Sequence, residues 1–270
     1  MSQVSFSILG AGNMGSILLK SLVSLPITSP GKISVFDPDP LCMKKAGKYK
    51  VRLAGHLREA VEGKAFVVLA VKPQNITAVL NEIRDILLPE AVLVSVAAGV
   101  SVEKIQTVLK RDQKVARAMP NVPAFIKKGM TALVYSGKMS PEEKAFVKRI
   151  FNRMGKTIVV TEDQMDAVTA LSGSGPAYVF TFVEALVEGG VKMGLPEPVA
   201  YRMATQTLFG AVKMLIKLDL SPAEQIKKVA SPGGTTLAGL AMLEKGRFKE
   251  SVVNAIEAAA KRSAELGKNP

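Results

Sequence analysis

A glycine-rich hexapeptide near the start of this 270-residue sequence constrains its fold more than any other feature. It follows an apolar run predicted as a strand over residues 4–9 and precedes a helical pattern over residues 14–24. In a G-x-G-x-x-G loop so placed, the first glycine makes a tight turn, the second lets a pyrophosphate approach the backbone, and the third lets the helix pack on the strand. We therefore predict a dinucleotide site, with a structural turn in another α/β fold as the alternative. The loop residues expected to contact the cofactor are Gly10, Ala11, Gly12, Asn13, Met14 and Gly15.

Up to about residue 161, short β-branched runs alternate with helical patterns, which is typical of βαβ units and a mainly parallel sheet. The predicted strands are residues 4–9, 33–37, 65–71, 91–97, 115–119, 131–135 and 157–160. The helices predicted among them are residues 14–24, 40–47, 76–86, 102–109 and 141–154. Beyond residue 161 the strand signal ends, and helices are predicted over 163–193, 198–217, 222–229, 235–245 and 248–266. The fold class is α/β, with a Rossmann-type dinucleotide-binding domain over residues 1–161 followed by an all-helical domain over residues 162–270.

The helical half is unusually apolar. Residues 185–191 and 200–211 leave little polar surface for water. Helices of this kind bury apolar faces against a neighbour, and we expect that neighbour to be another subunit. The sequence therefore predicts a homo-oligomer.

Composition narrows the chemistry further. The sequence has 36 Lys and Arg against 23 Asp and Glu, a net charge of +13 that suits a protein handling anions. The basic residues are dispersed and aromatic residues make up only 5%, so we predict no nucleic-acid partner. One cysteine and one histidine exclude an internal disulfide and multi-thiolate or His-rich metal sites, and we predict no metal. No run approaches about 18–20 uninterrupted apolar residues and no basic leader opens the chain, so we predict a soluble cytoplasmic protein without a membrane partner.

Later strand ends are expected to line the same crevice, because ligands of open α/β sheets bind beyond the carboxyl ends of the strands. Asp37 ends the second strand, at the offset expected for an acid that binds the adenosine ribose and repels a 2′-phosphate. It favours NADH; the alternatives are a turn acid, or a 2′-phosphate served by nearby lysines. The other predicted cofactor contacts at strand ends are Ala70, Val71, Lys72 and Pro73, and Val96, Ala97 and Ala98.

Six motifs occur in the order and spacing of a known family. They are GAGNMG at 10–15, AVKP at 70–73, AAG at 97–99, RAMPNVP at 117–123, LSGSGPAY at 171–178 and VASPGGTTLAGL at 229–240. With these, essentially the whole chain resembles the pyrroline-5-carboxylate reductases. The resemblance implies reduction of 1-pyrroline-5-carboxylate to proline with NADPH or NADH, the last step of proline biosynthesis. It also implies an intertwined dimer formed by the helical half, often assembled further into a decamer.

The segment Ser231-Pro232-Gly233-Gly234-Thr235-Thr236 agrees with that role. A proline followed by paired glycines cannot continue a helix, so the backbone opens and re-enters a helix near Thr235. We expect the free N–H groups of Gly234, Thr235 and Thr236, with the hydroxyls of Ser231 and Thr236, to form a cradle for a small carboxylate. On residue type alone, a helix–helix turn with a threonine N-cap is the alternative.

The resemblance also assigns roles. Thr236 is implied as the catalytic side chain that contacts the ring nitrogen, and the substrate-binding residues are implied to be Ser231, Gly233, Gly234, Thr235 and Thr236. Pro176 is implied to pack with Ala97 near the nicotinamide, and the cradle of one subunit is implied to meet the cofactor of its dimer partner. Two positions depart from the family habit: many relatives carry Ser, Thr or Asn near Asp37 and use NADPH, and Leu57 stands where many have Asn or Ser.

Two other functions remain open from the sequence. One is a different imine or β-hydroxyacid reductase of the same architecture, although residues 172–184 lack the lysine that hydroxyacid enzymes place on this helix. The other is a dinucleotide-binding sensor without turnover, which would need no carboxylate cradle.

Overall fold

The computed structural model describes residues 4–268 of the chain. It divides into two compact units: one comprises the chain up to Ser174 together with the segment from Ala259 onward, and the other comprises Gly175–Ala258. The predicted domain boundary at 161/162 therefore does not coincide with the division into compact units. The segment that follows residue 161 packs with the sheet, because Met165 and Val168 join a small apolar core with Ala132 and Val134.

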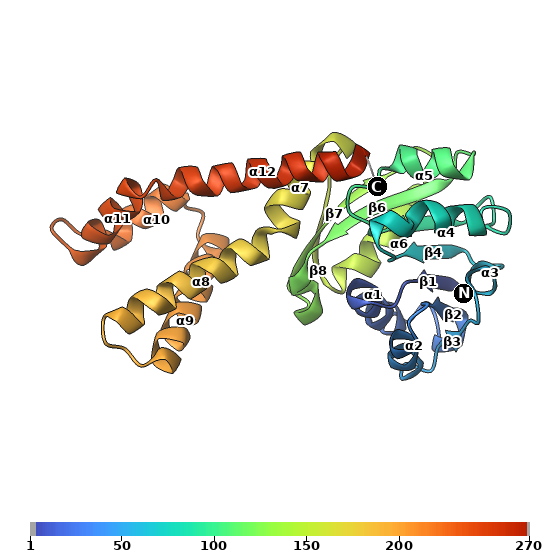
Figure 1. The fold of residues 1–270 in the computed structure, drawn as a ribbon, viewed down its shortest axis with the longest axis horizontal. Coiled ribbons are helices and arrows are strands. Elements are labelled where there is room, and N and C mark those ends of the chain that lie inside the picture. The colour runs from blue at the N-terminus through green and yellow to red at the C-terminus, as the bar shows by residue number, and fades with distance from the viewer. Residues whose placement is uncertain (1–3, 269–270) are drawn as a thin grey trace. The chain divides into compact units, whose positions relative to one another are not determined.

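An eight-stranded sheet forms the centre of the first unit (Figure 1). Its strands lie in the order β3-β2-β1-β4-β5-β6-β7-β8. Their bounds are Phe6–Leu9 (β1), Ile33–Phe36 (β2), Arg52–Leu53 (β3), Phe66–Leu69 (β4), Val92–Ser95 (β5), Lys114–Pro120 (β6), Gly129–Tyr135 (β7) and Gly155–Val159 (β8). All neighbouring pairs are parallel except β6 and β7, which confirms the mainly parallel sheet.

Helices cover both faces of this sheet (Figure 1). On one face α1 (Asn13–Val23), α2 (Pro40–Gly47) and α6 (Pro141–Asn152) pack on a core that includes Ile8 and Val68. On the other, α3 (Leu57–Val61), α4 (Ile76–Ile83) and α5 (Val102–Leu109) pack on Leu9 and Val67. Neighbouring residues of one strand thus belong to opposite cores, as the two-residue period of a strand requires.

The second unit is helical. It contains α8 (Gly175–Lys192), α9 (Glu197–Lys217), α10 (Pro222–Val229), α11 (Thr235–Lys245) and the first part of α12 (Phe248–Lys268). The helical stretch predicted over 163–193 is divided into parts: a 3₁₀ turn (Glu162–Gln164), the short α7 (Met165–Val168) and a π-helical turn (Thr169–Gly173) precede α8. Pro176 offers no N–H and so weakens an α-helix at this point.

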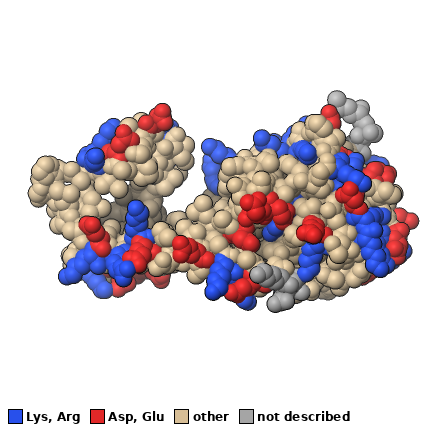
Figure 2. All heavy atoms as spheres, turned by 90° about the horizontal axis from the view of Figure 1, so that it is seen from above, with Lys and Arg blue, Asp and Glu red and all other residues tan. Residues whose placement is uncertain are grey.

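Many large apolar side chains of the second unit are exposed in the single chain, among them Phe180, Met193 and Ile216. The helical stretch Glu162–Lys192 is, by length and composition, long and apolar enough to cross a membrane. Charged side chains of the two signs are mixed on the face shown in Figure 2, where lysine and arginine lie among aspartate and glutamate. The exposed apolar faces are what the sequence predicts for helices that pack against a second subunit.

Candidate active site

The glycine loop has the geometry that its three glycines predict. A Cβ atom at Gly10 (φ +95°) would lie 2.6 Å from the carbonyl oxygen of Ala70, and one at Gly15 would lie 1.9 Å from the carbonyl oxygen of Gly10. Side chains are thus excluded where β1, β4 and α1 meet. Gly12 differs, because a Cβ there would have no heavy atom within 4 Å. The loop is therefore open at Gly12, immediately before the N-terminus of α1, where free N–H groups and the helix dipole favour a phosphate.

Asp37 is anchored to this loop. Its Oδ2 accepts a hydrogen bond from the N–H of Ala11 at 2.6 Å, and its Oδ1 accepts one from the N–H of Asp39 at 2.8 Å. The carboxylate thus points toward the glycine loop while it also stabilises the turn into α2. The structure thus shows the contacts of a turn acid, and the ribose-binding role of Asp37 stays a prediction.

The ends of β4 and β5 lie beside the loop. The N–H of Ala70 donates to the carbonyl of Leu9 at 2.8 Å, and the N–H of Val96 donates to the carbonyl of Leu69 at 3.1 Å. Because β1, β4 and β5 are parallel neighbours, residues 70–73 and 96–98 continue from the same edge of the sheet as the glycine loop. Lys72 is exposed at this edge, and Ala97 is buried. The residues fit a dinucleotide: an open backbone at Gly12, a helix N-terminus and a carboxylate at the second strand end.

The bend at residues 231–236 lies wholly in the second unit. The N–H of Gly234 donates to the carbonyl of Ser231 at 3.0 Å, and Gly233 has φ +72°. Proline followed by a glycine of positive φ is typical of a type II turn. A Cβ at Gly234 would lie 2.5 Å from Ser231 Oγ, so only glycine leaves room for that hydroxyl.

This geometry corrects one detail of the predicted cradle. The N–H of Gly234 is used within the turn, so it is not free for a ligand. The bend joins α10 to α11, as the alternative of a helix–helix turn predicts, but the N-cap of α11 is Gly234 and not a threonine. Within residues 4–268, the N–H groups of Thr235 and Thr236 have no partner, and both stand at the positive end of α11. These two N–H groups are the donors that remain for the predicted carboxylate, and the exposed Lys227 and Lys228 precede the bend.

Two polar contacts, one from β6 and one from the residue after it, were not predicted from the sequence. Arg117, only 5% exposed, forms an ion pair with Glu162. Asn121 donates to the carbonyl oxygen of Ser172 at 3.2 Å and accepts from the N–H of Met130 at 2.9 Å. The ion pair could have been expected from the position of Arg117 within the apolar run 115–119, because a buried charge requires a partner.

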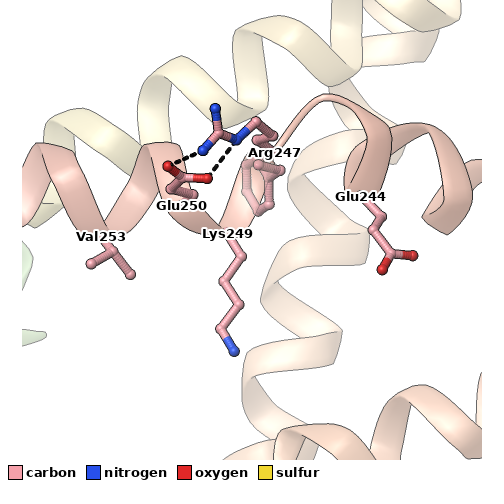
Figure 3. Close-up of a pocket in the computed structure, with 6 residues that line it drawn as sticks. Glu244, Arg247, Lys249, Glu250 and Val253 are labelled. Atoms are coloured by element: carbon pink, nitrogen blue, oxygen red, sulfur yellow. Dashed lines mark hydrogen bonds and ion pairs between the residues drawn. The ribbon is translucent and has the colours of Figure 1, made fainter.

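A hollow of about 420 Å³ on the second unit contains none of the predicted site residues. Arg247 and Glu250 in its wall form a two-pronged ion pair, while Lys249 and Glu244 point away from that pair (Figure 3). The remaining wall is supplied by Phe248 and Val253. The Arg247–Glu250 ion pair is thus satisfied within the wall of the hollow itself.

Sheet order, glycine loop and helical second region together define the class: an NAD(P)-binding α/β oxidoreductase with a helical second part. Residues 5–99 match the family model described as "NADP oxidoreductase coenzyme F420-dependent". Residues 162–266 match the model "Pyrroline-5-carboxylate reductase dimerisation".

Full-length relatives identify the family. The chain is 39% identical to a pyrroline-5-carboxylate reductase of Synechocystis sp., over 98% of this chain and 99% of that protein. It is 34% identical to that of Escherichia coli, over 97% of each. Its fold is similar to the Plasmodium falciparum pyrroline carboxylate reductase crystallised with NADP bound, with a TM-score of 0.90, 31% identity and 99% of each chain covered. Its fold is also similar to that of a pyrroline-5-carboxylate reductase from Coxiella burnetii, with a TM-score of 0.89, 32% identity and 98% of each chain covered. The chain belongs to the pyrroline-5-carboxylate reductase family.

Proposed function

We propose that this chain reduces 1-pyrroline-5-carboxylate to proline with NADPH or NADH, the last step of proline biosynthesis. Family membership over nearly the full length supports this reaction. The structural observation that carries it is the bend at 231–236, where two free N–H groups at a helix N-terminus fit a small carboxylate. A dinucleotide sensor without turnover has no need of such a site.

The carboxylate is held by the N–H groups of Thr235 and Thr236 together with the hydroxyl of Ser231, while Gly233 and Gly234 provide the turn. The hydroxyl of Thr236 then hydrogen-bonds the ring nitrogen. When bound, the reduced dinucleotide supplies a hydride, which adds to the carbon of the protonated C=N bond and leaves an amine. Because the protonated imine is already electrophilic, the residues contribute mainly orientation and one hydrogen bond, and no histidine or metal is required.

The dinucleotide is held by the glycine loop, Gly10 to Gly15, with residues 70–73 and 96–98 at the neighbouring strand ends. Asp37 binds the adenosine ribose and thereby favours NADH over NADPH. Pro176 packs against the nicotinamide together with Ala97. The support for this assignment is the shared sheet edge of the strand ends and the opening of the loop at Gly12.

The functional boundary of the domains falls at 161/162, where the dimerisation match begins. Homo-oligomerisation follows from that match, and a dimer in which the cradle of one subunit serves its partner's cofactor is the proposed unit of function. The exposed apolar side chains of Glu162–Lys192 then meet the second subunit rather than a membrane. A cytoplasmic location stays a prediction.

The direct test follows nucleotide oxidation by the purified chain with 1-pyrroline-5-carboxylate and, in parallel, with 1-pyrroline, which lacks the carboxylate. We expect turnover with the first and a KM raised by at least about tenfold with the second, the effect of losing charge-assisted hydrogen bonds. Equal KM values would remove the bend from substrate binding. Absence of turnover with either nucleotide would refute the reductase.

A further inference from the structure

The π-helical turn Thr169–Gly173 contains a carbonyl that the following helix cannot satisfy in the ordinary way. In an α-helix, the carbonyl oxygen of Ser172 would accept from the N–H of residue 176. Residue 176 is proline, which has no N–H. The carbonyl oxygen instead accepts from the side-chain Nδ2 of Asn121 at 3.2 Å.

The Asn121 amide is oriented by its other contact. The N–H of Met130 can only donate, so the atom 2.9 Å away is the amide oxygen, and the Nδ2 group faces Ser172. Nδ2 also lies 3.3 Å from Ser172 Oγ. One side chain thus ties together the end of β6, the start of β7 and the π-helical turn.

The same turn is packed closely against β6. A Cβ atom at Gly173 would lie 2.7 Å from the terminal methyl of Met119. The N–H of Ser174 donates five residues back to the carbonyl of Thr169 at 2.9 Å, the wide hydrogen-bond pattern that often occurs at functional sites. The turn is therefore held by defined contacts, and Ser174 and Gly175 lead from it to Pro176.

We propose that Asn121 is a positioning residue for the reduction: by satisfying the Ser172 carbonyl, it fixes the turn from which Pro176 projects. The inference rests on the proposed function, in which Pro176 packs against the nicotinamide. The contacts of Asn121 are with Ser172 and Met130, so its proposed role acts through the turn. Its effect is expected on the hydride step rather than on nucleotide affinity.

The test uses Asn121→Asp in the full-length chain. Aspartate keeps an oxygen for the Met130 N–H and nearly the same shape, but it replaces the Nδ2 donor by a second oxygen, so the variant loses the bonds to the carbonyl and the hydroxyl of Ser172 and adds one negative charge. Ser172→Ala removes the weaker hydroxyl contact and leaves the carbonyl intact. Asn152→Asp adds the same charge at an exposed position on α6 and serves as the matched control.

We expect Asn121→Asp to lower kcat by about tenfold or more, because Pro176 is no longer held in place beside the nicotinamide, and to leave the nucleotide Kd within about twofold. The deuterium isotope effect on kcat, measured with nucleotide deuterated at the transferred position, should rise. Both controls should remain within about twofold of wild type in kcat. A fall in kcat that only follows the loss of folded protein, with an unchanged isotope effect, would assign Asn121 a merely structural role and overturn the proposal.

A second background makes the result independent of stability. Pro176→Ala restores an N–H four residues beyond Ser172, which gives that carbonyl a helical partner. Asn121→Asp should therefore cost less in kcat in the Pro176→Ala background than in the wild type. Equal losses of kcat in the two backgrounds would contradict the proposal. If the aspartate variant does not fold, Asn121→Ala is compared in the same two backgrounds instead. Failure of the proposed function is distinguishable, because the wild-type chain would then show no turnover.

Discussion

Nucleotide selectivity gives the sharpest quantitative prediction, through Asp37→Ser. The Asp37 carboxylate is half-buried and fixed by two main-chain hydrogen bonds, at 2.6 Å from the Ala11 nitrogen and 2.8 Å from the Asp39 nitrogen. It cannot easily swing away from a 2′-phosphate bound beside it. Two like charges about 4 Å apart repel by about 1 kcal/mol in water and about 4 kcal/mol near a protein surface. For a half-buried group we expect about 1–3 kcal/mol, or about 5- to 150-fold.

Asp37→Ser also removes the hydrogen bond from Ala11, but that loss affects both nucleotides and cancels in their ratio. The quantity to measure is therefore the kcat/KM for NADH divided by the kcat/KM for NADPH, which should fall by about 5- to 150-fold. Asp39→Ser is the matched control. It removes the same charge two residues away, where the side chain instead caps α2 by accepting from the N–H of Leu41 at 2.8 Å. An unchanged ratio in Asp37→Ser, or an equal shift in Asp39→Ser, would refute the reasoning.

Three further predictions concern the fold and assembly. Gly267→Val should weaken nucleotide binding, measured by fluorescence titration. A Cβ at residue 267 would lie 3.0 Å from the carbonyl oxygen of Gly99, which follows the predicted cofactor contacts at residues 96–98. An unchanged affinity would show that the packing of α12 on Gly99 does not affect the cofactor site. Burial raises the pKa of Tyr135 to about 12 from 10.0, so its protonated form stabilises the folded state and that contribution is lost as pH rises from about 10 through 12. Tyr135→Phe should accordingly lose less stability than wild type between pH 9 and pH 11 in urea unfolding, and equal losses would show that Tyr135 does not titrate in this way. Leu186→Asp, on the apolar α8, should convert the oligomer to monomer in light scattering, and an unchanged mass would place the interface elsewhere.

Local signals predicted much of the fold. The predicted bounds of α2, α5, α10 and α11 are confirmed, and three of these helices begin at side-chain caps that the sequence displays: Asp39, Ser101 and Ser221. The two-residue β3 and the five-residue α3 were missed because so short a segment carries no measurable period. The break in the predicted helix 163–193 was missed because its apolar spacing continues through the π-helical turn.

The site was predictable where it depends on adjacent residues and not where it depends on distant ones. Strand, glycines and helix follow one another in the sequence, so the dinucleotide loop could be located directly. That the N–H of Gly234 is hydrogen-bonded within the turn could be seen only from the geometry of the turn. Contacts such as Arg117 with Glu162 and Asn121 with Ser172 join segments about fifty positions apart in sequence, 45 and 51 residues respectively, which no local pattern encodes.

The central claim is that the bend at 231–236 binds the substrate and that Thr236 assists at the ring nitrogen. Steady-state kinetics of Thr236→Ala and Thr236→Ser, with nucleotide Kd measured in parallel, test it most directly. We predict that alanine lowers kcat/KM by about 10- to 100-fold with Kd nearly unchanged, and that serine, which keeps the hydroxyl, restores most of the loss. Wild-type kcat/KM in the alanine variant would contradict the claim.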